Sequence, residues 1–192
     1  GRYLADLGAR VVRVEPSAGD ATRRRGPFVP ETDALEGALA HLLYNAGKES
    51  VVLDLEVDTS WDLIERLAAE ADVVIVPVEK SKRMSNWLSV LPSDGPSVVD
   101  AVMRRGQPDL AVSDLAAAAA GGLLYCCGFP DVAPDYPVGK LAYKQSAYVA
   151  VAAAVAAIFD RRLRGRRNTA LISLQEATAS STIRAANQNI WR

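Results

Sequence analysis

The sequence has a single histidine, His41, and only two cysteines, Cys126 and Cys127, among its 192 residues. One histidine excludes a multi-histidine metal site, so we expect no metal. Adjacent cysteines are badly placed to bridge each other, which excludes a disulfide framework. Two thiols in an apolar stretch are typical of a reducing compartment, and we therefore expect the protein in the cytoplasm.

The chain also lacks a charge excess of either sign, because 22 basic residues face 23 acidic ones. No global field therefore recruits nucleic acid or membrane. The densest basic segment, residues 161–167, falls at a predicted helix C-terminus, where the helix dipole favours cations. The most apolar run, residues 146–159, is too short to cross a bilayer. We expect neither nucleic acid nor a membrane as a partner.

Neither end of the chain has the signals of a complete element. Residues 1–7 have the pattern of the last turns of a helix, closed by Gly8 in the C-cap role, and nothing before them caps its start. Residues 175–191 are also predicted to be helical and stop without a terminator. We therefore expect the chain to be a fragment.

Short β-branched runs alternate with helical patterns along the chain. The runs predict strands at residues 10–15, 50–55, 72–78, 97–99 and 170–174. Helical spacing or alanine-rich composition predicts helices at residues 35–45, 58–67, 110–124, 146–163 and 175–191. Loops are predicted at residues 17–32 and 129–143, while residues 81–96 have no clear pattern. This alternation predicts an α/β fold with a Rossmann-like open parallel sheet and flanking helices.

Three basic groups are candidates for contacts with an anionic ligand. Arg23 opens a run of three arginines after the first predicted strand, and guanidinium groups match phosphate oxygens. Asn45 and Lys48 lie at the turn before the second strand. Arg83, with two lysines nearby, follows the third strand, and ligands of open parallel sheets bind beyond the carboxyl ends of strands. The alternative for each group is an ordinary solvated loop, and spacing alone does not decide.

The usual catalytic motifs are missing from the sequence. It contains no Ser-His-Asp elbow, no glycine-rich dinucleotide fingerprint and no phosphate-binding loop motif. Ser113 and Asp114 open an apolar helix and are most simply an N-cap pair. From the residues alone, the chain is an α/β domain that is a candidate to bind an anionic ligand.

The order of several segments resembles the family III CoA transferases, also called the CaiB/BaiF family. This group contains formyl-CoA, carnitine and bile-acid CoA transferases and α-methylacyl-CoA racemase. The segments that carry the resemblance are residues 1–9, 11–16, 19–23, 45–55, 67–74, 165–166 and 173–177. Their order and spacing extend across nearly the whole chain.

The resemblance implies that residues 1–192 form part of a Rossmann-like large domain that is incomplete at both ends. It implies acyl-CoA as the ligand, with Arg23, Asn45, Lys48 and Arg83 as the candidate CoA-binding residues. It also implies an interlocked homodimer or a second tandem copy as the partner. In this family, an aspartate attacks the acyl-CoA thioester, and CoA is then transferred to a carboxylic acid.

Tyr143 stands at the position of the family's nucleophilic aspartate. A phenol with a pKa near 10 cannot replace a carboxylate in forming an acyl anhydride. Ser113 stands where the racemase branch has a histidine, and residues 76–78 replace the usual segment after the third strand. These departures predict that this copy does not run the standard chemistry.

Four hypotheses follow for this chain. It is the degenerate half of a larger transferase, or a non-catalytic acyl-CoA-binding or dimerisation module that acts as a scaffold. It is an enzyme with altered chemistry that uses Asp114 or Tyr143, or an α/β domain without a ligand. We favour the first hypothesis and keep the second as the alternative.

Overall fold

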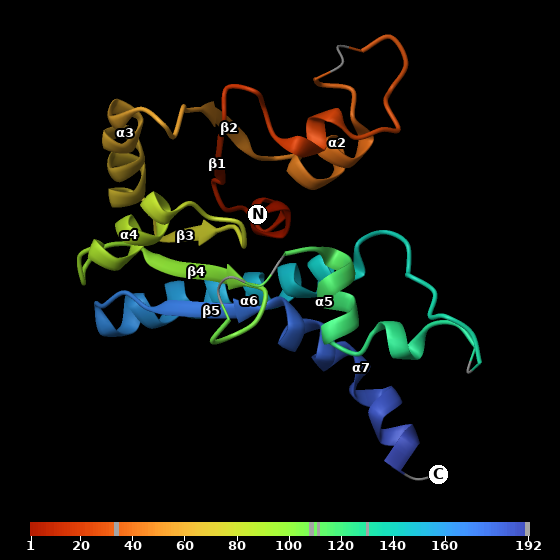
Figure 1. The fold of residues 1–192 in the computed structure, drawn as a ribbon. Helices are drawn as coiled ribbons and strands as arrows, with labels where there is room; N and C mark the ends of the chain where they lie inside the picture. Colours follow the sequence, from red (N-terminus) through yellow and green to blue (C-terminus); the bar gives the residue numbers. More distant parts are fainter. Residues whose placement is uncertain (33–34, 108–109, 111, 130, 191–192) are drawn as a thin grey trace. The chain divides into compact units, whose positions relative to one another are not determined.

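The computed structural model describes residues 1–32, 35–107, 110, 112–129 and 131–190. The chain divides into two compact units, Gly1–Ala69 and Glu70–Arg192. Each unit carries its own sheet (Figure 1). The strands pair in parallel in both sheets, which confirms the predicted parallel α/β architecture.

The Gly1–Ala69 unit is built around two parallel strands. Its elements are α1 (Arg2–Asp6), β1 (Val12–Glu15), the 3₁₀ helix η1 (Ala21–Arg24), α2 (Leu39–Asn45), β2 (Glu49–Val52) and α3 (Asp58–Ala69). Gly8 follows α1 with a backbone φ of +92°, a conformation that glycine adopts at little cost. Pro16 follows β1 directly and has no N–H to extend the ladder.

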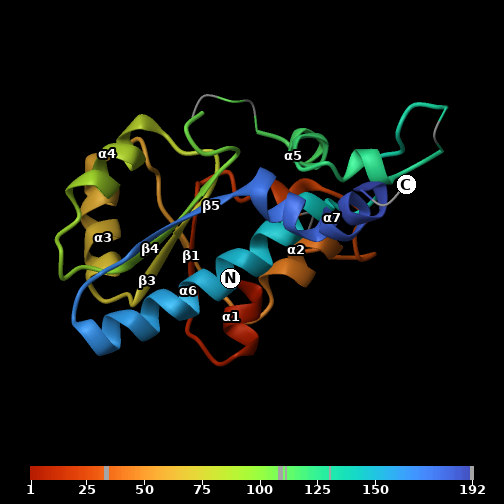
Figure 2. The ribbon, with the colours of Figure 1, turned by 90° about the horizontal axis from the view of Figure 1, so that it is seen from below.

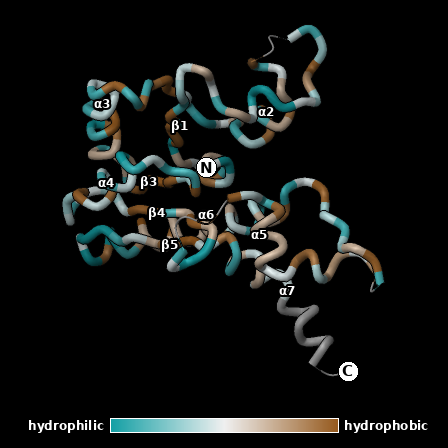
Figure 3. Tube along the Cα trace, in the orientation of Figure 1, coloured by the Kyte–Doolittle hydropathy of each residue, from teal (hydrophilic) through white to brown (hydrophobic). Residues whose placement is uncertain are grey.

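The Glu70–Arg192 unit is built around three parallel strands in the order β3-β4-β5. Its elements are β3 (Val73–Val76), α4 (Lys82–Val90), β4 (Ser97–Val102), α5 (Asp114–Ala120), the 3₁₀ helix η2 (Leu124–Cys126), α6 (Leu141–Arg164), β5 (Thr169–Ser173) and α7 (Leu174–Ile190). All four residues of β3 are apolar, as the hydropathy colouring shows (Figure 3).

Helix α6 lies along this three-stranded sheet and contacts all of its strands (Figures 1 and 2). The helix contributes the buried alanines Ala154 and Ala157, and the central strand contributes the buried Val98 and Val99. Burial of each valine side chain stabilises a fold by about 1.5–3 kcal/mol. The small alanines allow the helix backbone to approach the sheet closely.

A glycine allows α5 and α7 to meet closely in the same unit. A Cβ atom added to Gly121 would lie 2.5 Å from the Cβ of Thr178, which is fully buried on α7. Two side chains of α7 bond to the end of α5. Gln175 Nε2 donates to Ala120 O at 3.1 Å, and Thr182 Oγ1 donates to Gly121 O at 3.2 Å.

Several boundaries differ from the sequence prediction. Helix α4 was not predicted, although Ser81 caps it by accepting the Met84 N–H at 3.1 Å. Helix α2 begins four residues later than predicted. Helix α5 is shorter than the predicted 110–124 because Gly121 and Gly122 end it, with Gly122 at a φ of +78°. Residue 111 of that predicted helix and residue 191 of the last one lie outside the described residues.

Helix α6 begins at Leu141, earlier than predicted, so Tyr143 lies in its first turn and not in a loop. The helix has 24 residues, and its length and apolar composition would suffice to cross a membrane. The prediction that this segment is too short for a span was therefore wrong. Its contacts with the sheet and with α7 are those of a core helix.

Candidate functional site

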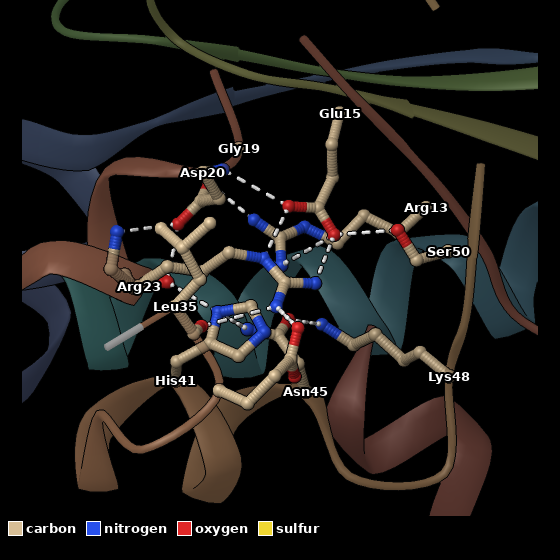
Figure 4. Close-up of polar contacts among 12 residues, drawn as sticks. Arg13, Glu15, Gly19, Asp20, Arg23, Leu35, His41, Asn45, Lys48 and Ser50 are labelled. Carbon is tan, nitrogen blue, oxygen red and sulfur yellow. Dashed lines mark hydrogen bonds and ion pairs between the residues drawn. The ribbon is translucent and has the colours of Figure 1, made fainter. Parts of the chain in front are cut away.

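A cluster of polar side chains lies in the Gly1–Ala69 unit, where β1, η1, α2 and β2 meet (Figure 4). We call it the polar cluster; its members are Arg13, Glu15, Asp20, Thr22, Arg23, His41, Asn45, Lys48 and Ser50. Parallel pairing brings two members together, because Arg13 on β1 lies opposite Ser50 on β2. The loop and 3₁₀ turn that follow β1 fold back over the end of this strand and supply further members.

Glu15 is the centre of the polar cluster and is only 2% exposed. Its carboxylate accepts Arg23 Nε at 2.8 Å and Arg23 Nη2 at 2.9 Å. It also accepts Ser50 Oγ at 2.6 Å and the Asp20 backbone N–H at 3.0 Å. The bond from Arg23 is the main reason that the pKa of Glu15 lies well below its usual range, although burial opposes the shift.

Arg23 uses most of its donors within the protein. Besides the pair with Glu15, Arg23 Nη1 donates to Glu36 Oε1 at 2.6 Å and to Leu35 O at 3.3 Å. The bond to Glu15 raises the pKa of Arg23. This geometry supports a structural role, in which a buried bidentate pair holds the 3₁₀ turn against β1. A direct contact of Arg23 with a ligand stays a prediction.

Arg13 is the second cation beside Glu15. Its Nη2 pairs with Asp20, and its Nη1 lies 3.7 Å from Glu15 Oε1. Within the described residues, this buried Nη1 has no hydrogen-bond partner. A buried guanidinium nitrogen without a partner costs free energy, so it is a candidate to receive an acceptor from a ligand or water.

Within the polar cluster, a chain of hydrogen bonds joins Lys48 to Asn45 and His41. Lys48 Nζ donates to Asn45 Oδ1 at 2.7 Å, and Asn45 Nδ2 lies 3.2 Å from His41 Nδ1. Burial, and then the charge of Arg13, lower the pKa of Lys48. Burial, and then the charges of Arg23 and Arg13, lower the pKa of His41. Arg13 therefore lies close enough to Lys48 and His41 to lower the pKa of both side chains.

The structure brings three of the four predicted CoA-binding residues into this one cluster, namely Arg23, Asn45 and Lys48. The fourth, Arg83, is exposed on α4 in the other unit. Across the described part of the chain, no three His, Cys, Asp or Glu side chains gather as a set of metal ligands. The expected absence of a metal stays a prediction.

Tyr143, at the predicted nucleophile position, meets a carboxylate from another element. Its backbone N–H donates to Asp114 Oδ1 at 2.7 Å. The Tyr136 hydroxyl donates to Asp114 Oδ2 at 2.6 Å, and this bond raises the pKa of Tyr136 to about 12. Asp114 is 6% exposed at the start of α5, where Ser113 Oγ accepts the Ala116 N–H as predicted for an N-cap. The carboxylate also caps the first turn of α6.

Sequence reasoning did not select several residues of these two places as site residues, among them Arg13, Glu15, His41 and Tyr136. Glu15 and Arg13 alternate with valines in a strand, and that pattern usually indicates a solvent-facing edge. Only the spacing of Glu15 and Asp20 before a run of arginines could have indicated an ion-pair network. His41 was considered only as the single histidine that excludes a multi-histidine metal site.

Comparisons with known proteins agree over nearly the whole chain. The family model described as CoA-transferase family III matches residues 1–191. Succinyl-CoA:(R)-benzylsuccinate CoA-transferase subunit BbsE from Thauera aromatica is 30% identical over 193 residues, covering 96% of this chain and 47% of that protein. Succinate–glutarate CoA-transferase from Agrobacterium fabrum is 47% identical over 79 residues, covering 39% of this chain and 20% of that protein.

A solved structure shares the fold. The crystal structure of a CAIB/BAIF family protein from Brucella suis aligns with a TM-score of 0.84 and 25% identity, covering 99% of this chain and 52% of that one. The chain therefore spans about half the length of this structure and of the benzylsuccinate relative.

Proposed function

We propose a binding function for this chain, which belongs to CoA-transferase family III. It binds acyl-CoA as a degenerate, catalytically impaired half of a larger transferase, whose other part supplies the chemistry. Residues 1–192 form part of the large domain of that protein, and the whole protein is cytoplasmic. The reaction we propose for the whole protein is transfer of CoA from an acyl-CoA to a carboxylic acid.

The cations of the polar cluster support the binding half of this proposal. Lys48 and Arg13 lie close enough for Arg13 to lower the pKa of Lys48, and Arg13 Nη1 has no hydrogen-bond partner within the described residues. A phosphate between the two cations would relieve their repulsion and accept from the unpartnered nitrogen. This pair of cations is the observation that carries the proposal of a CoA phosphate as the ligand.

The environment of Tyr143 supports the proposal that this copy is catalytically impaired. A tyrosine hydroxyl attacks a thioester only weakly at neutral pH, because its usual pKa is about 10. The nearest carboxylate, Asp114, is buried and accepts two hydrogen bonds. A carboxylate held in this way caps α6 and accepts from Tyr136, and these bonds support a structural role for it.

Calorimetry with free CoA and with acetyl-CoA tests the binding. We expect Lys48→Met to weaken the affinity by roughly tenfold or more, because a charge-assisted hydrogen bond contributes about 1.5–3 kcal/mol. Arg66→Met is the matched control, since Arg66 is exposed on α3 in the same unit, and should bind as the wild type does. Absence of heat at millimolar ligand would leave only a scaffold role.

Replacement of Tyr143 by aspartate tests the impaired chemistry. We expect Tyr143→Asp to show no transferase turnover, because Ser113 and residues 76–78 also depart from the pattern of the family. Appreciable CoA transfer to a carboxylic acid in this variant would contradict the proposal.

The alternative is a dimerisation or scaffold module, and the surface of α6 favours it. Val155, Phe159 and Leu163 are 49%, 64% and 68% exposed along this helix. Their spacing places them on one side of the helix. A partner that covers this side would be a second chain in an interlocked homodimer or a tandem copy. Sedimentation of the wild type and of Phe159→Lys tests it, with a monomeric wild type as the contrary result.

A further inference from the structure

His41 has one ring nitrogen shared between two neighbours (Figure 4). Its Nδ1 lies 2.9 Å from Thr22 Oγ1 and 3.2 Å from Asn45 Nδ2. The ring is 5% exposed, and His41 is the only histidine of the chain. The protonation of this nitrogen decides which neighbour it bonds.

Lys48 fixes the orientation of the Asn45 amide. An ammonium group has only donors, so the Asn45 atom 2.7 Å from Lys48 Nζ must be the oxygen. The NH₂ group of Asn45 then faces His41, and it donates to Nδ1 in the form of the ring whose Nδ1 has no proton. A neutral ring that accepts at Nδ1 carries its proton on Nε2.

A proton on Nδ1 reverses this preference. The nitrogen then becomes a donor that faces the donor of Asn45, and that contact is lost. Thr22 still fits, because its hydroxyl hydrogen points to Asp20 and its oxygen accepts from the ring. Protonation therefore moves His41 from Asn45 to Thr22 and leaves the Asn45 amide free to turn away from Lys48.

We propose that His41 is a proton-controlled positioning residue: in its neutral form it holds Asn45, and through Asn45 the ammonium of Lys48, in the geometry that meets an anionic ligand. Protonation of His41 releases Lys48 and weakens binding. The ligand part of this inference rests on the proposed function, whereas the proton position and its effect on Asn45 do not.

The charged groups around His41 favour its neutral form. Burial lowers its pKa most, followed by Arg23 from η1 and Arg13 from β1. Glu15 and Asp20 oppose them. The neutral ring is therefore the form at neutral pH, and the change occurs below the ordinary histidine pKa of about 6.5.

Nitrogen-15 NMR of the 192-residue chain tests the position of the proton on His41 directly, because a single histidine gives unambiguous ring signals. At pH 8 we expect the Nε2–H tautomer, and a proton on Nδ1 would overturn the proposal. Asn45→Ala removes a donor to the neutral ring, so it should raise the His41 pKa by roughly half a pH unit or more. Asn86→Ala, on the exposed surface of α4, is the control and should leave it unchanged.

Calorimetry with free CoA tests the second part, at pH 8 and at a pH about one unit below the His41 pKa that the NMR titration gives. His41→Asn keeps an acceptor near the Nδ1 position that does not titrate. The phosphates of CoA titrate identically in both proteins, so only the difference between them is informative. We expect wild-type affinity to fall several-fold more than that of His41→Asn between these pH values. Equal pH dependence would overturn the positioning role; no binding at either pH would refute the proposed function, and the NMR result would then decide the inference.

Discussion

Replacement of Glu15 by glutamine is the sharpest test of what holds the Gly1–Ala69 unit together. The change keeps the shape of the side chain and removes its charge. Every oxygen of Glu15 accepts hydrogen bonds from donors, among them Arg23, Ser50 and the Asp20 N–H. Whichever way the new amide turns, its NH₂ faces at least one of these donors.

The expected loss follows from the charges that remain buried. Arg23 and Arg13 have 14% and 18% of their side chains exposed, and both lose a counter-ion in Glu15→Gln. Breaking a buried ion pair by removing one partner costs about 3–5 kcal/mol where the remaining charge is uncompensated. Arg23 keeps Glu36 and Arg13 keeps Asp20 as partners, so the cost here lies near the lower end, about 3 kcal/mol. We therefore expect the free energy of unfolding of this unit to fall by about that amount.

Glu49→Gln is the matched control in the same sheet. Glu49 also forms two bonds to an arginine, Arg10, at 2.9 and 2.8 Å. That pair is exposed, with 75% and 56% of the two side chains accessible, and solvent screens it, so its loss should change stability little. Urea unfolding with hydrogen exchange of the β1 and β2 amides measures both variants. Equal effects of Glu15→Gln and Glu49→Gln would refute the reasoning from burial.

Two further predictions concern acid stability and helix contact. Folding lowers the pKa of the Glu15 carboxyl. The charged carboxylate therefore contributes fully to the free energy of unfolding above the unfolded-state pKa of about 4.3, and this contribution is lost as the pH falls through the folded-state pKa. The difference between wild type and Glu15→Gln in urea midpoints should therefore shrink below about pH 4.3; a constant difference down to pH 3 would contradict it. Gly121→Ala should lower the thermal midpoint, because the new Cβ would lie 2.5 Å from Thr178 Cβ. Gly121 has a φ of −86°, so left-handed backbone strain does not contribute, and an unchanged midpoint would contradict the expected clash.

The sequence was sufficient to predict where the strands lie, and it predicted the helices less well. Each predicted strand is a short run with β-branched residues, and the structure has a strand whose bounds lie within three residues of each prediction. Helix α4 has a mixed, polar sequence, and one buried residue of that helix is Trp87, so tertiary packing and the Ser81 cap stabilise it more than its own pattern does. The start of α6 was missed for a related reason. Asp114, distant in sequence, caps its first turn through the Tyr143 N–H, and a cap of this kind leaves no local signal.

Some residues of the candidate site could be predicted from local sequence, whereas others depend on contacts between distant segments. Asn45 and Lys48 could be identified because they are three residues apart on one turn, and the structure places them 2.7 Å apart, Nζ to Oδ1. Their electrostatic environment depends on Arg13, which lies on a strand more than thirty residues earlier. It also depends on His41, whose role is determined by whether Asn45 or Thr22 forms the hydrogen bond to its Nδ1. The resemblance to a family directs attention to the residues that match it. From the sequence, His41 served only to exclude a multi-histidine metal site. In our proposal its proton decides whether the matching residues are held in place, so this property depends on a residue outside the matching segments.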